Sequence, residues 1–208
     1  MLLVEGPDDK HVVIHIRERN APMPAFDIKD KGSVEEVLCA ISSEVKVSGR
    51  EAVGIMVDAN ESLSSRWQAV ANKIRRVGVV LPATPCLNGT IAGQIADFPR
   101  LRIGVWLMPD NVSSGELEHF IARMIPEKDP VWPMASAYIG QIIEPAFKPK
   151  KRRRAEVHAW LAAREEPRQM GLAITARDLE TETDVCERFV AWLRALFAES
   201  GSVDDPGT

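Results

Sequence analysis

The sequence lacks several features that would place it in a class of protein at once. Among 208 residues there are three cysteines, and their spacing fits neither a zinc site nor a disulfide framework. No apolar run approaches the roughly 18 residues that span a bilayer, and the first residues lack the basic region and cleavage site of a signal peptide. These absences predict a cytoplasmic protein with no membrane partner.

Two kinds of chemistry are also poorly represented. No GxxxxGK[ST] segment is present, so hydrolysis of ATP through a phosphate-binding loop of that type is not expected. Tyr138 is the only tyrosine, and its neighbours Ile139 and Ile143 indicate a packing role rather than a covalent nucleophile. The net charge of -4 argues against coating nucleic acid through overall charge, but it leaves a local basic patch open.

Short apolar runs alternate with amphipathic segments over the first 125 residues. Three of these runs predict strands buried on both faces of a sheet, at residues 2–4, 52–57 and 103–108, and a further short strand is expected at 26–28. Helical patterns lie between them at residues 8–19, 34–45 and 64–76. This alternation predicts an α/β domain, residues 1–125, with a mainly parallel sheet flanked by helices.

Proline residues punctuate the chain after residue 125. Amphipathic patterns at residues 153–164 and 183–197 predict helices, the second with an apolar face for packing on the α/β domain. We therefore expect a C-terminal helical extension over residues 126–199, followed by a disordered tail, residues 200–208.

An acidic residue stands at or just past the end of each of the three main apolar runs. These residues are Glu5, Asp58 and Asp110. In a parallel sheet the carboxyl ends of the strands share one edge, where ligands bind, so these carboxylates should converge there. Because carboxylates in a small volume repel one another, a divalent cation that prefers oxygen ligands is the common remedy. The pattern predicts a Mg²⁺ or Mn²⁺ site.

Three further acidic residues belong to the same prediction. Glu118 lies in the first turns of the next expected helix and has no local duty, so it is favoured as an additional ligand. For Glu116 two roles are open, since Ser113-x-x-Glu116 also fits a capping box. Asp9 follows Pro7 in a first helical turn, where it would either favour the helix dipole or act in catalysis.

The residues around these acids resemble two motifs of the Toprim superfamily, which includes topoisomerases, primases, recombination proteins and OLD-type nucleases. A strand ending in Glu-Gly-x-x-Asp is present as VEGPDD, and a strand ending in Asp-x-Asp is present as MVDAN. Within the superfamily the chain is most similar to an uncharacterised bacterial Toprim-related family. That similarity includes the GVWLMPDN strand end and the stretch AEVHAWLA to FVAWLRALF, residues 155–197.

The resemblance implies a Toprim-like fold and a nuclease-like metal site. It implies Glu5 as metal ligand or general acid/base, Asp58 as ligand and Glu118 as additional ligand, for Mg²⁺ or Mn²⁺. Asn60 departs from the motif, because the second acid of Asp-x-Asp is an amide here. An amide oxygen can bind Mg²⁺ but brings no charge, which lowers the expected affinity and leaves an inactive protein open.

Two other patterns bear on function. His11 and His15 are one helical turn apart, but apolar neighbours and the missing glutamate of HExxH favour a partly solvated helix face over zinc.

The run KPKKRRR places positive charge where a helix begins, against the helix dipole. Nucleic-acid phosphates or acidic neighbours such as Glu156 would compensate it, and both remain open. The candidate nucleic-acid-binding residues are Lys148, Lys150, Lys151, Arg152, Arg153 and Arg154.

The combined prediction is a divalent-metal-dependent phosphodiesterase acting on DNA or RNA, with a separate ATPase protein as the partner that the resemblance implies. A non-catalytic Toprim-like subunit that binds metal or nucleotide is the alternative, and Asn60 favours it. A phosphoryl-transfer enzyme acting on a small molecule is the third hypothesis, because strand-end acids and Mg²⁺ serve that chemistry too.

Overall fold

The computed structural model describes residues 1–93 and 98–198, and it shows an α/β protein built on one mostly parallel sheet. The five strands run in the order β2-β1-β3-β5-β4, and β4 alone is antiparallel to its neighbour. Their bounds are β1 Leu2–Val4, β2 Ile28–Asp30, β3 Ala52–Asp58, β4 Thr90–Ala92 and β5 Arg102–Met108. The predicted tail, residues 200–208, lies outside the described residues.

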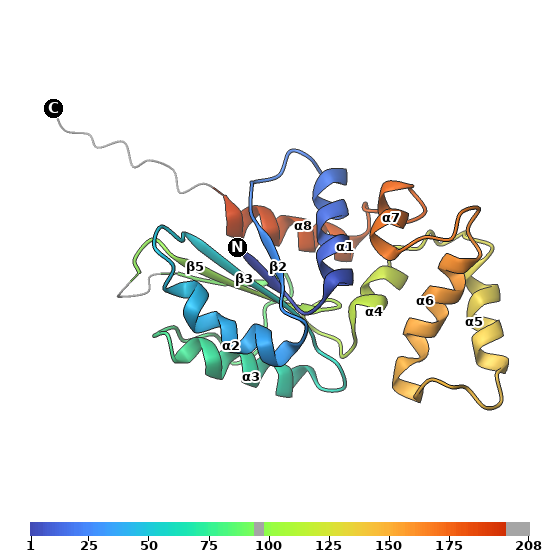
Figure 1. Cartoon of the computed structure of the whole chain (residues 1–208), viewed down its shortest axis with the longest axis horizontal. Helices are drawn as coiled ribbons and strands as arrows, with labels where there is room; N and C mark the ends of the chain where they lie inside the picture. The colour runs from blue at the N-terminus through green and yellow to red at the C-terminus, as the bar shows by residue number, and fades with distance from the viewer. Residues whose placement is uncertain (94–97, 199–208) are drawn as a thin grey trace.

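Helices cover both faces of this sheet (Figure 1). In that view α2 (Val34–Val45) and α3 (Leu63–Arg75) lie below the sheet, while α1 (Pro7–Arg19) and α8 (Asp184–Phe197) lie above it. The other helical elements are α4 (Leu117–Ala122), α5 (Trp132–Gln141), η1 (Pro149–Lys151), α6 (Arg152–Ala162) and α7 (Met170–Thr175). Within the described residues, no helix is both long and apolar enough to cross a membrane.

The sequence specifies the starts of the helices that follow the strands. Pro7 stands at the beginning of α1, where its missing N–H costs nothing and its fixed φ suits a helix. Ser33 Oγ accepts a hydrogen bond of 3.2 Å from the backbone N–H of Glu36 at the start of α2. Ser62 does the same for Ser65 before α3, also at 3.2 Å. These caps define where the chain leaves the sheet edge that carries the acidic residues.

The C-terminal helix α8 completes the core. Gly54 and Gly104 are paired neighbours on β3 and β5, and Leu196 of α8 packs directly on them. A Cβ at either glycine would approach a Leu196 methyl carbon to within 3.0 Å at Gly54 and 2.5 Å at Gly104. The two glycines therefore let α8 lie close to the sheet, and α8 is an integral cover of one sheet face.

Some expected elements differ from the observed ones. The short strand predicted at 26–28 lies instead at Ile28–Asp30, because Phe26 leaves the sheet to stack on Phe197, with ring centroids 4.2 Å apart. β4, α5, η1 and α7 were not predicted as separate elements, and β4 and α7 carry no recognisable period over their short lengths. The interpretation of Tyr138 as a packing residue is wrong: its side chain lies on α5 and the residue is 63% exposed.

Candidate functional site: an acidic cleft at the strand ends

The carboxyl ends of β1 and β3 open into a cleft of about 370 Å³. Glu5 and Asp9 reach it from the end of β1 and the start of α1, and Asp58 reaches it from the end of β3. The residues Glu116 and Glu118 enter from the start of α4. The structure thus brings together five of the predicted acidic residues.

Hydrogen bonds to the main chain hold three of these carboxylates. Glu5 Oε1 accepts from the backbone N–H of Asp58 at 2.7 Å, and Asp58 Oδ1 accepts from the backbone N–H of Leu117 at 2.9 Å. Asp9 Oδ2 accepts from the backbone N–H of Gly6 at 3.0 Å. The chain of contacts from Glu5 through Asp58 to Leu117 links β1, β3 and α4, so the position of each acid depends on the others.

The negative charge of the cleft is only partly compensated. Burial, followed by the charge of Glu5, raises the pKa of Asp9 to about 7. Burial, followed by the charges of Asp9 and Glu5, raises the pKa of Asp58 well above its usual range. Burial also raises the pKa of Glu5, although the backbone N–H of Asp58 opposes this. The charge of Glu5 therefore makes both Asp9 and Asp58 harder to ionise, and the charge of Asp9 adds to this effect at Asp58.

Two cations enter the cleft from the C-terminal region. Lys151 Nζ lies 2.7 and 2.8 Å from the two carboxylate oxygens of Glu116, and Arg154 Nε lies 3.3 Å from Glu118 Oε1. Both glutamates are nearly inaccessible to solvent, at 6% and 5% exposure. Part of the predicted basic run thus faces the predicted acidic cluster, a contact between segments that sequence reasoning treated separately.

The rest of the basic run is paired mainly with residues outside the cleft. Arg152 and Arg153 lie 2.9 and 2.8 Å from the two oxygens of Glu156. Lys150 lies 3.3 Å from Glu61, and Lys148 is exposed just before η1. The acidic neighbour Glu156 therefore accounts for two of the charges at the start of α6, as one of the open interpretations expected.

Asn60 lines the cleft from a left-handed backbone position. Its φ is 53°, and its backbone N–H and C=O exchange hydrogen bonds of 2.7 and 2.8 Å with Gly115. With the amide oriented to satisfy both ends, its nitrogen donates to Glu116 Oε1 at 3.2 Å and its oxygen accepts from Arg66 Nη2 at 3.0 Å. The predicted ligand oxygen is thus engaged by an arginine.

Asp110 is not among the residues that line the cleft. Its carboxylate instead accepts from the backbone N–H groups of Val112 and Ser113 and pairs with Arg123 at 2.5 Å. Although burial raises it, these hydrogen bonds lower the pKa of Asp110 overall. The structure therefore gives Asp110 a role in shaping the turn after β5, where the sequence predicted a metal ligand.

The capping box between Ser113 and Glu116, one of the two roles left open for Glu116, is not formed. Glu116 is the residue that precedes the first turn of α4, and its backbone N–H donates to His119 Nδ1 at 3.1 Å. This leaves the Glu116 carboxylate available for the cleft. His11 and His15 both contact the α7 region, through Gln169 at 3.4 Å and Thr175 at 2.8 Å, which favours packing over zinc.

The acids do not form a closed metal cage by themselves. Over residues 1–93 and 98–198, no group of three His, Cys, Asp or Glu side chains is arranged closely enough to enclose an ion. The donor set is nevertheless made of carboxylate oxygens, which Mg²⁺ and Mn²⁺ prefer, and its excess negative charge favours a cation. The three carboxylates predicted as ligands, those of Glu5, Asp58 and Glu118, all line the cleft.

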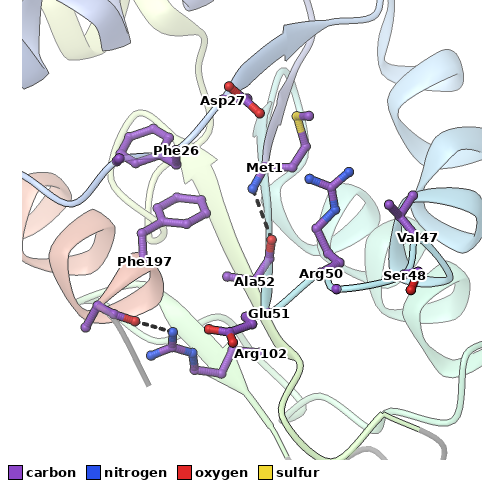
Figure 2. A pocket seen from close by; sticks show the side chains of 13 residues that line it. Met1, Phe26, Asp27, Val47, Ser48, Arg50, Glu51, Ala52, Arg102 and Phe197 are labelled. Carbon is purple, nitrogen blue, oxygen red and sulfur yellow. Dashed lines mark hydrogen bonds between the residues drawn. The ribbon is translucent and has the colours of Figure 1, made fainter. Parts of the chain in front are cut away.

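A second hollow of about 400 Å³ lies at the opposite edge of the sheet (Figure 2). The amino group of Met1 donates to the carbonyl of Ala52 at 3.1 Å, and the guanidinium of Arg102 donates to the carbonyl of Ala198. Open α/β sheets bind ligands outside the carboxyl ends of their strands, whereas this hollow is at the amino ends. We therefore assign the candidate site to the acidic cleft.

The fold and the cleft define an α/β protein with an acidic, cation-lined site at the carboxyl edge of its sheet. Over residues 1–198 the chain matches the model of a family described as protein of unknown function DUF3226, and it belongs to that family. Neither the curated proteins nor the solved structures yielded a match.

Proposed function

We propose that the protein is a divalent-metal-dependent phosphodiesterase that acts on nucleic acid. One observation carries the proposal: acids from β1, α1, β3 and α4 meet two cations in a single cleft. Acids can hold a metal ion and cations can hold a phosphate, so the cleft has both halves of such a site. The resemblance of VEGPDD and MVDAN to Toprim motifs supports the same proposal.

Mg²⁺ or Mn²⁺ bound at Glu5, Asp58 and Glu118 would polarise the phosphate and lower the pKa of a water molecule. Glu5 is oriented by its hydrogen bond from the Asp58 N–H, and its other carboxylate oxygen would serve either as a metal ligand or as the general base that accepts a proton from the attacking water. Lys151 and Arg154 would hold the non-bridging phosphate oxygens. Asp9 and Glu116 would adjust the charge around this centre.

Cleavage of plasmid DNA and of RNA with Mg²⁺ or Mn²⁺ tests the proposal. Wild type should cut in a metal-dependent manner, and Glu5→Gln and Asp58→Asn should each lose at least about a hundredfold in rate. Glu187→Gln serves as the matched control, because Glu187 is an exposed glutamate on α8, outside the cleft. Cutting that survives both cleft substitutions would count against the assignment of the site.

Asn60 supports a second candidate, a non-catalytic subunit that binds metal or nucleotide. Its side chain is an uncharged amide and adds no negative charge to the cleft. Its hydrogen bonds to Glu116 and Arg66 also engage both ends of the amide. Metal or nucleotide binding by calorimetry, without cleavage of any nucleic acid, would identify this function. A separate ATPase protein as partner belongs to the phosphodiesterase proposal, and co-purification of the protein with an ATPase tests it. A cytoplasmic setting is part of both proposals.

A further inference from the structure

Lys151 and Arg154 occupy the acidic cleft in the way that a bound cation would. Both oxygens of Glu116 are within 2.8 Å of the Lys151 ammonium, and Arg154 lies 3.3 Å from Glu118. Because Glu116 and Glu118 are almost fully buried, their charges need a partner in the protein. The side chains that would serve a metal ion and the side chains that would serve a phosphate are therefore bound to each other.

The two ion pairs compensate one side of the cleft only. Glu5, Asp9 and Asp58 receive hydrogen bonds from backbone N–H groups, but within the described residues no ion pair to these carboxylates is formed. The resting cleft thus divides into a half at α4 whose carboxylates are ion-paired and a half at β1 and β3 whose carboxylates have no ion pair in the described part of the chain, although the charge of Arg66 acts on Glu5. A divalent ion that bridges the halves has to take the place of a cation at Glu118 or Glu116.

We propose that Lys151 and Arg154 are exchangeable internal counter-cations that couple metal binding to phosphate binding. This inference rests on the proposed function, since it concerns the same site. In the metal-free protein the two side chains neutralise Glu116 and Glu118. When a divalent ion binds at Glu5, Asp58 and Glu118, Arg154 leaves Glu118, Lys151 leaves the adjoining Glu116, and both side chains move to a phosphodiester in the same cleft.

The surroundings of the two cations suit such an exchange. Arg152 and Arg153 are fixed to Glu156, and the Arg153 guanidinium lies over the Trp132 ring, 5.5 Å from its centroid. These contacts keep the start of α6 in place while the neighbouring side chains change partners. Lys151 and Arg154 are themselves partly accessible, at 36% and 48%, so solvent and ligands can reach them.

Metal affinity provides the first test. We would titrate Mn²⁺ into the full chain and follow binding by calorimetry and by the electron paramagnetic resonance signal of free Mn²⁺. Removing a competing cation should tighten binding about tenfold in Lys151→Gln and in Arg154→Gln. Lys150→Gln removes the same charge one residue away. Because Lys150 pairs with exposed Glu61 rather than with a residue of the cleft, the Mn²⁺ affinity of this variant should change less than about twofold.

Nucleic-acid affinity provides the second test, measured by fluorescence anisotropy of a labelled single-stranded oligonucleotide. With Ca²⁺ in place of the catalytic metal, wild type should bind the oligonucleotide several-fold more tightly than without it. This enhancement should be lost when Lys151→Gln and Arg154→Gln are combined. Thermal melting followed by circular dichroism verifies that each variant is folded.

The outcomes separate this inference from the proposed function. Mn²⁺ binding that is equal in wild type, Lys151→Gln and Arg154→Gln overturns the exchange alone. Binding by the two variants but not by wild type supports it, because the internal cations then win the competition. If none of the proteins binds Mn²⁺, both the metal site and the exchange are overturned.

Discussion

The backbone N–H of Asp58 donates a 2.7 Å hydrogen bond to Glu5 Oε1, so the end of β3 is tied to the carboxylate that follows β1. The same residue, Asp58, accepts from the N–H of Leu117 through its side chain. Asp58 is therefore both a member of the acidic cluster and the link between two strands and α4. Substitutions in the cleft act on stability as well as on chemistry.

Two substitutions at Glu5 separate these effects. In Glu5→Gln the amide oxygen can still accept from Asp58, so stability should be retained or rise slightly, because repulsion with Asp9 disappears. In Glu5→Ala the N–H of Asp58 loses its partner, which should cost about 1–3 kcal/mol of unfolding free energy. Urea denaturation measures both. Equal destabilisation by the two variants would show that the charge, not the hydrogen bond, matters for folding.

The raised pKa of Asp9 predicts how stability depends on pH. The folded protein holds the Asp9 proton up to a pKa of about 7, whereas an unfolded chain releases it near the ordinary aspartate pKa of 3.8. Between these values the folded state binds more protons, so a rising pH lowers stability, and the penalty is complete above pH ~7. Below pH ~4 the penalty is absent.

Asp9→Asn isolates this contribution, because its oxygen can still accept from Gly6. The variant and wild type should be equally stable near pH ~4, and the variant should be more stable by about 2–4 kcal/mol near pH ~8. Denaturation of the metal-free proteins across this range is the measurement. Mn²⁺ should remove much of the difference by stabilising the ionised cluster, and a constant difference at all pH values would contradict the assignment.

Asn60→Asp tests the residue that departs from the Asp-x-Asp motif. The new carboxylate would lose the donation to Glu116 and face its charge, although Arg66 remains nearby, so the metal-free protein should lose about 1 kcal/mol of stability. Mn²⁺ should bind more tightly and cleavage should increase. Calorimetry and the DNA cleavage assay check this. A protein that neither binds metal nor cuts after the substitution favours the non-catalytic subunit.

Gly104→Ala tests the packing of α8 on the sheet. The added Cβ would lie 2.5 Å from a Leu196 methyl carbon, and the strand would have to move or the helix to shift, at a cost of about 1–3 kcal/mol. Gly93→Ala is the control, because its Cβ would meet neighbours only at 3.9 Å or more. Thermal denaturation compares the two. Equal melting temperatures would indicate that α8 adapts freely.

The main strands of the sheet could be predicted from the sequence, because apolar runs without alternation are typical of buried parallel strands. Residues 2–4 and 103–108 were expected close to where β1 and β5 lie, and the convergence of Glu5 and Asp58 follows from parallel strand order. Elements of only three residues are harder to predict from the sequence. β4 pairs through backbone groups with β5, and that pairing leaves no periodic pattern in Thr90–Ala92.

Contacts between distant segments account for what could not be predicted at the site. Nothing in the local sequence of Lys151 or Glu116 indicates that they meet, since 35 positions separate them. The prediction of Asp110 as a metal ligand failed for a related reason. Its position after a strand is typical of a metal ligand, but its carboxylate already accepts hydrogen bonds from nearby backbone N–H groups and pairs with Arg123. A carboxylate followed within three residues by serine, as in Asp110 to Ser113, is the signal that could have indicated a turn.

The separation of the acidic and basic halves along the chain also has a consequence for protein synthesis. The ribosome makes Glu5, Asp58 and Glu118 before it makes Arg154, and it makes α8, which covers one face of the sheet, after that. Until these later segments have been made, a nascent chain lacks both the cations that pair with Glu116 and Glu118 and the helix that covers this sheet face. Assembly of the cleft therefore waits for the basic run, and a polypeptide that stops before it would lack the cations that balance the two glutamates.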